Sequence, residues 1–157
     1  MKEYSRDKRS PVSSGPSVSR SMSSNKSKNT VPELRLRRAL RDEGLSGYRL
    51  HRKDVPGKPD ITYIGKKLAI FVNGCFWHRC PFCKLPLPKS NADFWTDKFR
   101  KNIERDISKK ELLEAEGWFV LTVWECEIKK DISEVVSRIK TKLSQSEMES
   151  IYPNDCR

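Results

Sequence analysis

The sequence predicts one α/β domain in which helices flank a mixed β-sheet. Three observations support this fold class. Residues 68–72, LAIFV, are uniformly apolar, as in a strand with both faces covered. A helical pattern over residues 94–116 leads into a second apolar strand, WFVLTVWE, which is the order of a crossover unit. Residues 131–143 then form an amphipathic helix that closes the domain.

The first half of the chain supplies the remaining elements. Thr30 to Glu33 has the form of a capping box, with Thr at the N-cap, a proline in the first turn and Glu at N3. A helix of about a dozen residues follows, and Gly44 ends it. Residues 48–51 predict a short strand, and residues 57–74 predict two strands joined by a turn at Gly65-Lys66.

Composition bounds the class of protein. The 157 residues are 36% hydrophobic, enough for one core, and contain no run of about 18 uncharged apolar residues. The basic N-terminus lacks the apolar centre of a signal peptide, so we expect an intracellular protein with no membrane contact. The net charge of +11 indicates a polyanionic partner, nucleic acid above all. A basic surface without any ligand has the same composition.

The ends of the chain differ from its centre. Residues 1–30 hold ten serines, seven Lys or Arg and two acids, too few apolar groups to offset the chain entropy lost on folding. We therefore divide the chain into a basic tail at residues 1–20, disordered without a partner, a folded domain at 21–145 and a C-terminal tail at 146–157.

Four cysteines have the spacing of a metal site. Cys75, Cys80 and Cys83 form C-x4-C-x2-C, and Cys126 follows the second apolar strand. Strand ends of one sheet can be adjacent, which would complete a tetrahedral zinc site. Four cysteine ligands leave no open position, so the zinc would be structural. His78 in the same loop is a spare donor that could replace one cysteine.

A redox site is the alternative for these cysteines. Residues 80–83, CPFC, have the form of a glutaredoxin-like active site, in which the first cysteine begins a helix. The proline-rich KLPLPKS follows at once and argues against such a helix. Cys75 and Cys126 are superfluous to a two-thiol mechanism, so the pattern favours zinc and leaves Cys156 over.

An acid precedes the first strand of the predicted hairpin. Asp60 ends the turn GKPD, and Gly, Pro and Asp are ordinary turn residues. A carboxylate there can also hold Mg²⁺, which fills its octahedron with waters and phosphate oxygens. Pro-Asp before a hairpin strand is the arrangement of the PD-(D/E)xK nucleases, although residues 68–72 lack the acid and lysine of that signature.

Five strings together carry a family resemblance. They are SKNTVPELRLRRAL, PGKPD, FVNGCFWHRCPFC, FWTDKFRKNIERD and GWFVLTVWEC. In this order the chain resembles the very short patch repair (Vsr) endonucleases over about residues 20–140. The resemblance implies a restriction-endonuclease-like core and a Mg²⁺-dependent endonuclease. Such an enzyme nicks one DNA strand 5′ of the thymine in a T·G mismatch, which deamination of 5-methylcytosine produces.

The resemblance also implies the residues of the active site. Asp60 matches the metal-binding aspartate, and Val72 stands where a backbone carbonyl helps to hold Mg²⁺. His78 matches the histidine that assists the attacking water, a role suited to an imidazole. Glu33 matches a glutamate that acts with this histidine or the metal-bound waters, although capping also explains it. Asn73 stands where some relatives have a second histidine.

Aromatic side chains match the family's DNA wedges. Phe76, Trp77 and Trp95 match side chains that enter the duplex beside the mismatch, and Met22 matches one that enters from the opposite groove. A mismatched step costs less to unstack than a paired one, so wedges discriminate between them. Core packing is the alternative for Trp95, which opens an amphipathic helix. The zinc site would stiffen the loop that carries the wedges.

The implied partner is double-stranded DNA with a T·G mismatch, bound by a monomer through phosphate contacts of Lys and Arg. The resemblance further implies a bacterial cytoplasmic, nucleoid-associated protein with a functional link to a cytosine-5 methyltransferase. Two other classes remain open on sequence alone: a non-catalytic zinc-stabilised DNA-binding protein and a thiol oxidoreductase.

Overall fold

The computed structural model describes residues 15, 16 and 26–151, and Met22 and Cys156 lie outside these ranges. The elements are α2 (Val31–Asp42), β1 (Arg49–Leu50), β2 (Ile61–Tyr63), the 3-10 turn η1 (Ile64–Lys66), β3 (Leu68–Asn73), α3 (Ala92–Ala115), β4 (Phe119–Trp124), α4 (Glu125–Lys130) and α5 (Ile132–Ile151). None of the helices in the described ranges is both long and apolar enough to span a lipid bilayer.

The four strands form one mixed sheet in the order β1-β2-β3-β4. β1 with β2 and β2 with β3 are antiparallel, whereas β3 and β4 are parallel, from the pair Leu68 and Phe119 to the pair Asn73 and Trp124. The predicted mixed α/β fold is confirmed. Because β3 and β4 run in the same direction, their C-terminal ends meet at one edge of the sheet.

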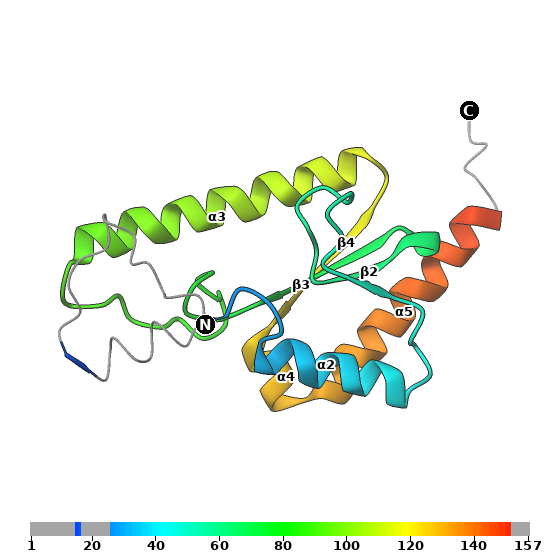
Figure 1. The fold of residues 1–157 in the computed structure, drawn as a ribbon, viewed down its shortest axis with the longest axis horizontal. Coiled ribbons are helices and arrows are strands. Elements are labelled where there is room, and N and C mark those ends of the chain that lie inside the picture. Colours follow the sequence, from blue (N-terminus) through cyan, green and yellow to red (C-terminus); the bar gives the residue numbers. More distant parts are fainter. Residues whose placement is uncertain (1–14, 17–25, 152–157) are drawn as a thin grey trace, which may run out of the picture.

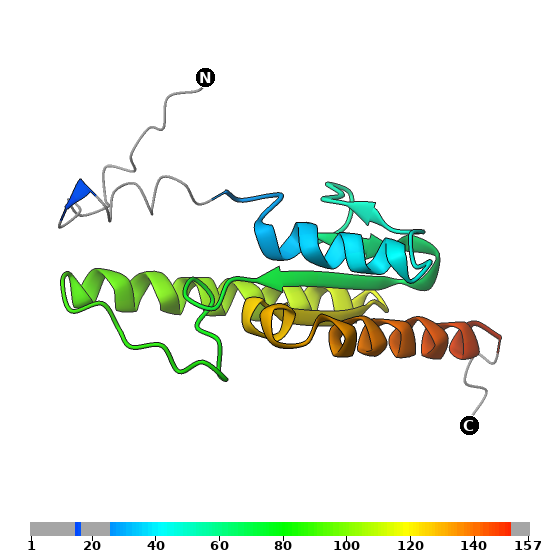
Figure 2. The same cartoon turned by 90° about the horizontal axis from the view of Figure 1, so that it is seen from below.

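Helices cover both faces of the sheet. In Figure 1, α3 lies above the strands, and α2, α4 and α5 lie below them; Figure 2 shows α2 and α5 on either side of β3 when seen from below. The larger core cluster joins the sheet to α2, α4 and α5, with fully buried Leu36, Ile70 and Ile139 among its members. A smaller cluster joins Leu113 of α3 to Ala69 of β3. The N-terminal part of α3 extends beyond the sheet.

The start of α2 follows from its sequence. Thr30 is the N-cap, and its side chain accepts a hydrogen bond from the N–H of Glu33, with proline in the first turn. The Glu33 carboxylate accepts from the N–H of Asn29 (2.9 Å), one residue before the position expected for a capping box. Glu33 also pairs with Arg37 at 3.2 Å. Capping therefore accounts for part of the bonding of Glu33, as the sequence predicts.

Several predicted boundaries were wrong. β1 covers only two exposed residues rather than residues 48–51, and η1 with left-handed Lys67 (φ 46°) replaces the simple Gly-Lys turn. The helix α4 was not predicted: Cys126 follows β4, as expected, but it lies on this helix. Its sequence ECEIKK has no apolar period, and its start depends on the Glu127 carboxylate, which accepts from the N–H of Trp124 (2.8 Å). α5 continues to Ile151, past the predicted end at residue 143.

The turn before β2 places Asp60. Gly57 and Lys58 both have left-handed backbone conformations, with φ of 72° and 52°. A Cβ atom on Gly57 would lie 3.0 Å from Cβ of Lys109 on α3, closer than ordinary packing allows. Pro59 is fully buried, which fixes the chain directly before Asp60. A glycine is therefore needed at residue 57 for both its conformation and its close approach to α3.

Replacing this glycine tests the turn. We expect Gly57→Ala to lower the free energy of unfolding by about 1 to 2 kcal/mol, because alanine is strained at positive φ and its methyl group contacts Lys109. Gly65→Ala is the matched control, since a Cβ atom there has nothing within 4 Å. Urea unfolding of both variants measures the difference. Equal losses in the two variants would contradict the role given to Gly57.

Candidate functional site

Three elements bring two acids and a histidine together. Glu33 comes from α2, His51 follows β1 and Asp60 precedes β2, and one ligand atom from each lies within 4.8 Å of the others. Nε2 of His51 is 3.5 Å from Oε2 of Glu33, and its Nδ1 is 3.8 Å from Oδ1 of Asp60. Glu33 is only 2% exposed. The structure thus unites the predicted Glu33 and Asp60, and adds His51, which the sequence analysis missed.

Asp60 is tied to the central strand. Its Oδ2 accepts a hydrogen bond from the N–H of Val72 on β3 (2.8 Å). Burial raises the pKa of Asp60 to about 6, and the charge of Glu33 adds to this; the Val72 N–H bond and the charges of Lys109 and His78 act in the opposite direction. A desolvated carboxylate beside a buried second carboxylate is well matched to a hard cation, which would neutralise both.

His51 does not supply a positive charge that would offset the carboxylates of Glu33 and Asp60 at neutral pH. Burial lowers the pKa of its imidazole, and the charge of Arg37 acts in the same direction, against the raising effect of Glu33. The only sequence signal for this residue was scarcity, since the whole chain has two histidines. A neutral imidazole keeps a lone pair available for a hydrogen bond or a metal ion.

The second histidine is paired with an acid from α3. Nδ1 of His78 lies 2.5 Å from Oδ2 of Asp106, and both side chains are partly exposed. A carboxylate accepts, so Nδ1 carries the shared proton and Nε2 remains free to accept another. No sequence pattern marks Asp106, because 28 residues separate it from His78. This pair has the form of a general base with an orienting carboxylate.

Lys109 also reaches the site from α3. Its charge lowers the pKa of Asp60, and its Nζ lies 5.9 Å from the centre of the Phe71 ring. Together with Asn73, His78 and Asp106 it lines a cavity of about 330 Å³ between α3 and the sheet. Lys109 on α3 thus places a positive charge near Asp60, although β3 itself has no lysine at residues 68–72.

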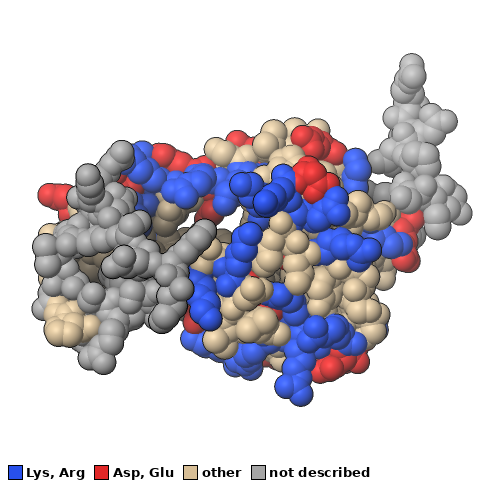
Figure 3. Space-filling model, in the orientation of Figure 1, with Lys and Arg blue, Asp and Glu red and all other residues tan. Residues whose placement is uncertain are grey.

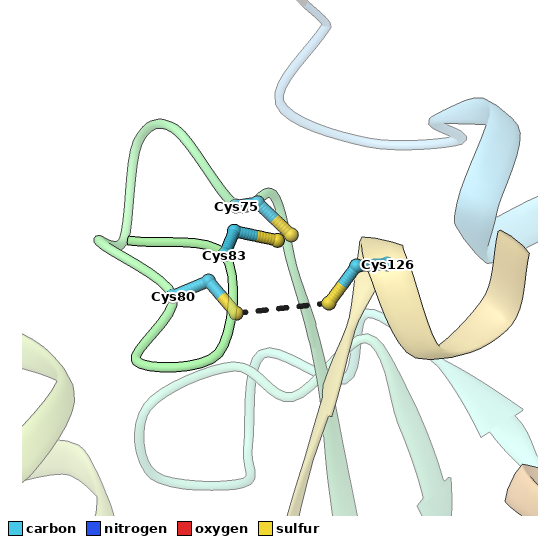
Figure 4. Close-up of side chains that lie close together, drawn as sticks. All are labelled: Cys75, Cys80, Cys83 and Cys126. Carbon is cyan, nitrogen blue, oxygen red and sulfur yellow. Dashed lines mark hydrogen bonds between the residues drawn. The ribbon is translucent and has the colours of Figure 1, made fainter. Parts of the chain in front are cut away.

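The four predicted cysteine ligands converge. All four Sγ atoms lie within 4.8 Å of one another, and those of Cys80 and Cys126 are 3.7 Å apart (Figure 4). A tetrahedral site with metal–sulfur bonds of about 2.3 Å requires sulfur–sulfur distances of about 3.8 Å. Cys75, Cys80 and Cys83 come from the loop after β3, and Cys126 comes from α4. The arrangement fits a tetrahedral four-thiolate metal site.

The environment of the thiols also fits a metal. Burial raises the pKa of Cys75 and raises that of Cys126 to about 11. Burial acts in the same direction on Cys80, but hydrogen bonds from the backbone N–H groups of Cys83 and Phe82 outweigh it and lower the pKa of Cys80. Cys75 and Cys126 are therefore thiols in the absence of metal, and a bound cation would be needed to hold all four groups as thiolates. Residues 80–91 form turns and irregular chain without the helix that a redox site would need at Cys80.

The predicted wedge residues form one aromatic cluster. The ring of Phe76 lies 5.2 Å from that of Trp77, 5.6 Å from that of Trp95 and 5.2 Å from that of Phe99. Trp95 is 7% exposed, whereas Phe76 and Trp77 are half-buried. Entry of Trp95 into DNA would therefore require the cluster to open. Met22 lies outside the described residues, and all four wedge roles remain predictions.

Positive charge lies close to these sites. Figure 3, in the orientation of Figure 1, shows many Lys and Arg side chains on the surface between α3 and α2, with fewer acids among them. Such a surface favours binding of a phosphate backbone. The fold and these clusters define an α/β protein with two groups of metal-ligating side chains beside a basic surface.

Comparisons with known proteins identify the family. The sequence model of the DNA mismatch endonuclease Vsr matches residues 12–84. The type II nicking enzyme V.XorIIP of Xanthomonas oryzae pv. oryzae is 44% identical over 122 residues, which cover 77% of this chain and 88% of that protein. V.NmeAIP of Neisseria meningitidis is 46% identical over 103 residues (66% and 73%). The DNA mismatch endonuclease Vsr of Escherichia coli is 35% identical over 111 residues (71% and 70%). The chain belongs to the Vsr endonuclease family.

The thiol cluster predicts a measurable metal stoichiometry. We expect one tetrahedral metal ion per chain, and Co²⁺ in its place should give the intense thiolate charge-transfer bands of a four-sulfur site. Cys126→Ser should weaken these bands, because one of four thiolates is lost, and should lower stability, because it removes the ligand that joins the loop to α4. Cys156→Ser is the control and should leave both unchanged. A spectrum unaltered by Cys126→Ser would contradict the site.

The raised pKa of Asp60 predicts that removal of its charge stabilises the metal-free protein at neutral pH. When the pKa of a carboxyl group rises on folding, the free energy of unfolding of the protein falls as pH rises from about 3.8 to about 6. In Mg²⁺-free buffer at pH 7.5, Asp60→Asn should therefore be more stable than the wild type, by up to about 3 kcal/mol, with no gain below pH 4. Asp54→Asn is the control: this acid is exposed and pairs with Arg52, so its replacement should give at most a small loss. Urea unfolding across pH, without chelator, tests both.

Proposed function

We propose that this protein is a Mg²⁺-dependent DNA endonuclease that nicks one strand 5′ of the thymine in a T·G mismatch, and so begins very short patch repair. One observation carries the proposal: the desolvated Asp60 is bonded to β3 beside Glu33, and His78 is close enough to influence its charge. Family membership supports the reaction class, since the Escherichia coli relative is a DNA mismatch endonuclease.

The residues divide the work of hydrolysis. Asp60 and the backbone carbonyl of Val72 would hold the metal ion, with Glu33 beside it to act on the ion or on its waters. A Mg²⁺ ion held there would supply charge stabilisation for the scissile phosphate. His78 accepts the proton of the attacking water at Nε2, while Asp106 holds the ring through Nδ1. The products are a 3′-hydroxyl and a 5′-phosphate, with no covalent intermediate.

Recognition of the mismatch is assigned to the aromatic cluster. Phe76 and Trp77 are half-buried on the loop that also carries His78, so the wedges and the general base share one short segment. Trp95 joins them when the cluster opens on DNA, and Met22 acts from the other groove. Zinc at the four cysteines stiffens this loop within a restriction-endonuclease-like core. The nearby Lys and Arg bind phosphates without reading sequence.

The biological setting follows from the same proposal. A monomer acts on mismatches left by deamination of 5-methylcytosine, in the cell that contains the corresponding cytosine-5 methyltransferase. The nicking relatives in Xanthomonas and Neisseria are named as type II nicking enzymes, which is consistent with a single-strand cut.

A nicking assay tests the proposal. We expect the full chain to cut a labelled T·G duplex in one strand, 5′ of the thymine, with Mg²⁺ and not without it, and to leave the T·A duplex intact. Asp60→Ala should abolish the cut because it removes the metal ligand. His78→Ala should lower the single-turnover rate by about 10²- to 10⁴-fold.

Asp54→Ala is the matched control, because Asp54 lies on the exposed side of the same loop and should cut at the wild-type rate. Duplexes with varied flanking bases are included so that sequence context does not hide activity. Tight mismatch binding without a cut on any duplex would favour the alternative, a zinc-stabilised DNA-binding protein without catalysis.

A further inference from the structure

His51 occupies a position that capping and packing do not explain. Its side chain is 15% exposed and lies between the carboxylates of Glu33 and Asp60. Its Nε2 atom is buried and has no hydrogen-bond partner among the described residues. A buried nitrogen without a hydrogen-bond partner is unfavourable. Its place beside two acids therefore indicates that a ligand binds between these three side chains.

The backbone holds this ring in place. His51 has a left-handed conformation with φ of 46°, which is uncommon for a residue other than glycine. Its N–H donates to the carbonyl oxygen of Asp60 (3.3 Å), the last contact before β1 and β2 separate. The strained residue is thus bonded directly to the residue proposed to bind the metal. Strain of this kind accumulates where a side chain must be aimed.

Distances suit a shared cation. Oε2 of Glu33 and Nε2 of His51 are 3.5 Å apart, too far for a good hydrogen bond. Two donors that bind one ion at about 2.1 Å in adjacent positions are separated by about 3 to 3.5 Å. Glu33, His51 and Asp60 come from three elements, and their ligand atoms all lie within 4.8 Å.

We propose that His51 contributes an imidazole nitrogen to the catalytic metal site and gives this site a preference for Mn²⁺ over Mg²⁺. This inference rests on the proposed function, because it assigns a further ligand to the same ion. Both ions favour oxygen ligands, but Mn²⁺ belongs to the transition-metal series, whose affinity for nitrogen donors exceeds that of Mg²⁺, so one imidazole ligand shifts the balance towards Mn²⁺. His51 is thereby a specificity-determining residue for the metal and takes no proton in the reaction.

Electron spin echo spectroscopy of bound Mn²⁺ tests this directly, since it detects a nitrogen nucleus bonded to the ion. The chain has only two histidines, so the source of such a signal can be assigned. We expect a directly bound ¹⁴N signal in the full-length wild type, and its replacement by a ¹⁵N signal after labelling with ¹⁵N-histidine. This comparison needs no substitution and is independent of how a variant folds.

Variants then identify the histidine. His51→Gln should remove the nitrogen signal and weaken Mn²⁺ binding about tenfold, with a smaller change for Mg²⁺. His78→Gln is the matched control and should keep the signal. Calorimetric titration with each metal measures the affinities, and the ratio of nicking rates in Mn²⁺ and Mg²⁺ should fall in His51→Gln.

The outcomes separate the two proposals. Mn²⁺ that binds in the wild type and not in Asp60→Asn, but shows no histidine nitrogen, would overturn the role of His51 and leave the proposed active site intact. A nitrogen signal that is lost in His78→Gln instead would do the same. Mn²⁺ binding that is indifferent to Asp60→Asn would overturn both.

Discussion

The parallel pairing of β3 with β4 is the constraint on which both sites depend. Six residue pairs, from Leu68 and Phe119 to Asn73 and Trp124, hold the two strands in register. Their C-terminal ends therefore lie together, and the cysteine loop that follows β3 meets α4 that follows β4. A parallel pair also requires a long crossover, and here the crossover is α3. The element that topology demands is the one that carries Asp106 to His78 and Lys109 towards Asp60.

Burial of Asp60 has opposite effects on the stability of the metal-free protein and on the attraction of this carboxylate for a cation. Desolvation raises the pKa of Asp60 and so disfavours its charged form in the absence of metal. The same desolvation strengthens its attraction for a cation, because the competing water has been removed. Glu33 combines two roles in a similar way, since one carboxylate accepts from Asn29 at the start of α2 and also faces His51. The capping contact of Glu33 is thus compatible with the role proposed for it beside Asp60.

The sequence predicts features that repeat or follow fixed spacing. The apolar run of β3, the periodic helices and the C-x4-C-x2-C pattern each repeat a signal, and the structure contains them all. His51 and Asp106 are single residues whose partners lie far along the chain, so no pattern marks them. α4 was missed because a six-residue charged helix depends on one capping contact of Glu127. Trp95 has a periodic position that fits core packing and DNA contact equally, and its burial in the free protein follows from neighbours on a distant loop.

The absence of charge on β3 now has a physical reason. This strand is central, and the core on one face and α3 on the other leave little room for an acid or a lysine there. β3 provides backbone groups instead, and the N–H of Val72 fixes Asp60 from the side. The charges come from helices that pack against the two faces, with Glu33 on α2 and Lys109 on α3. A central strand that lacks an acid and a lysine can therefore still have both kinds of charge near Asp60, because the neighbouring helices provide them.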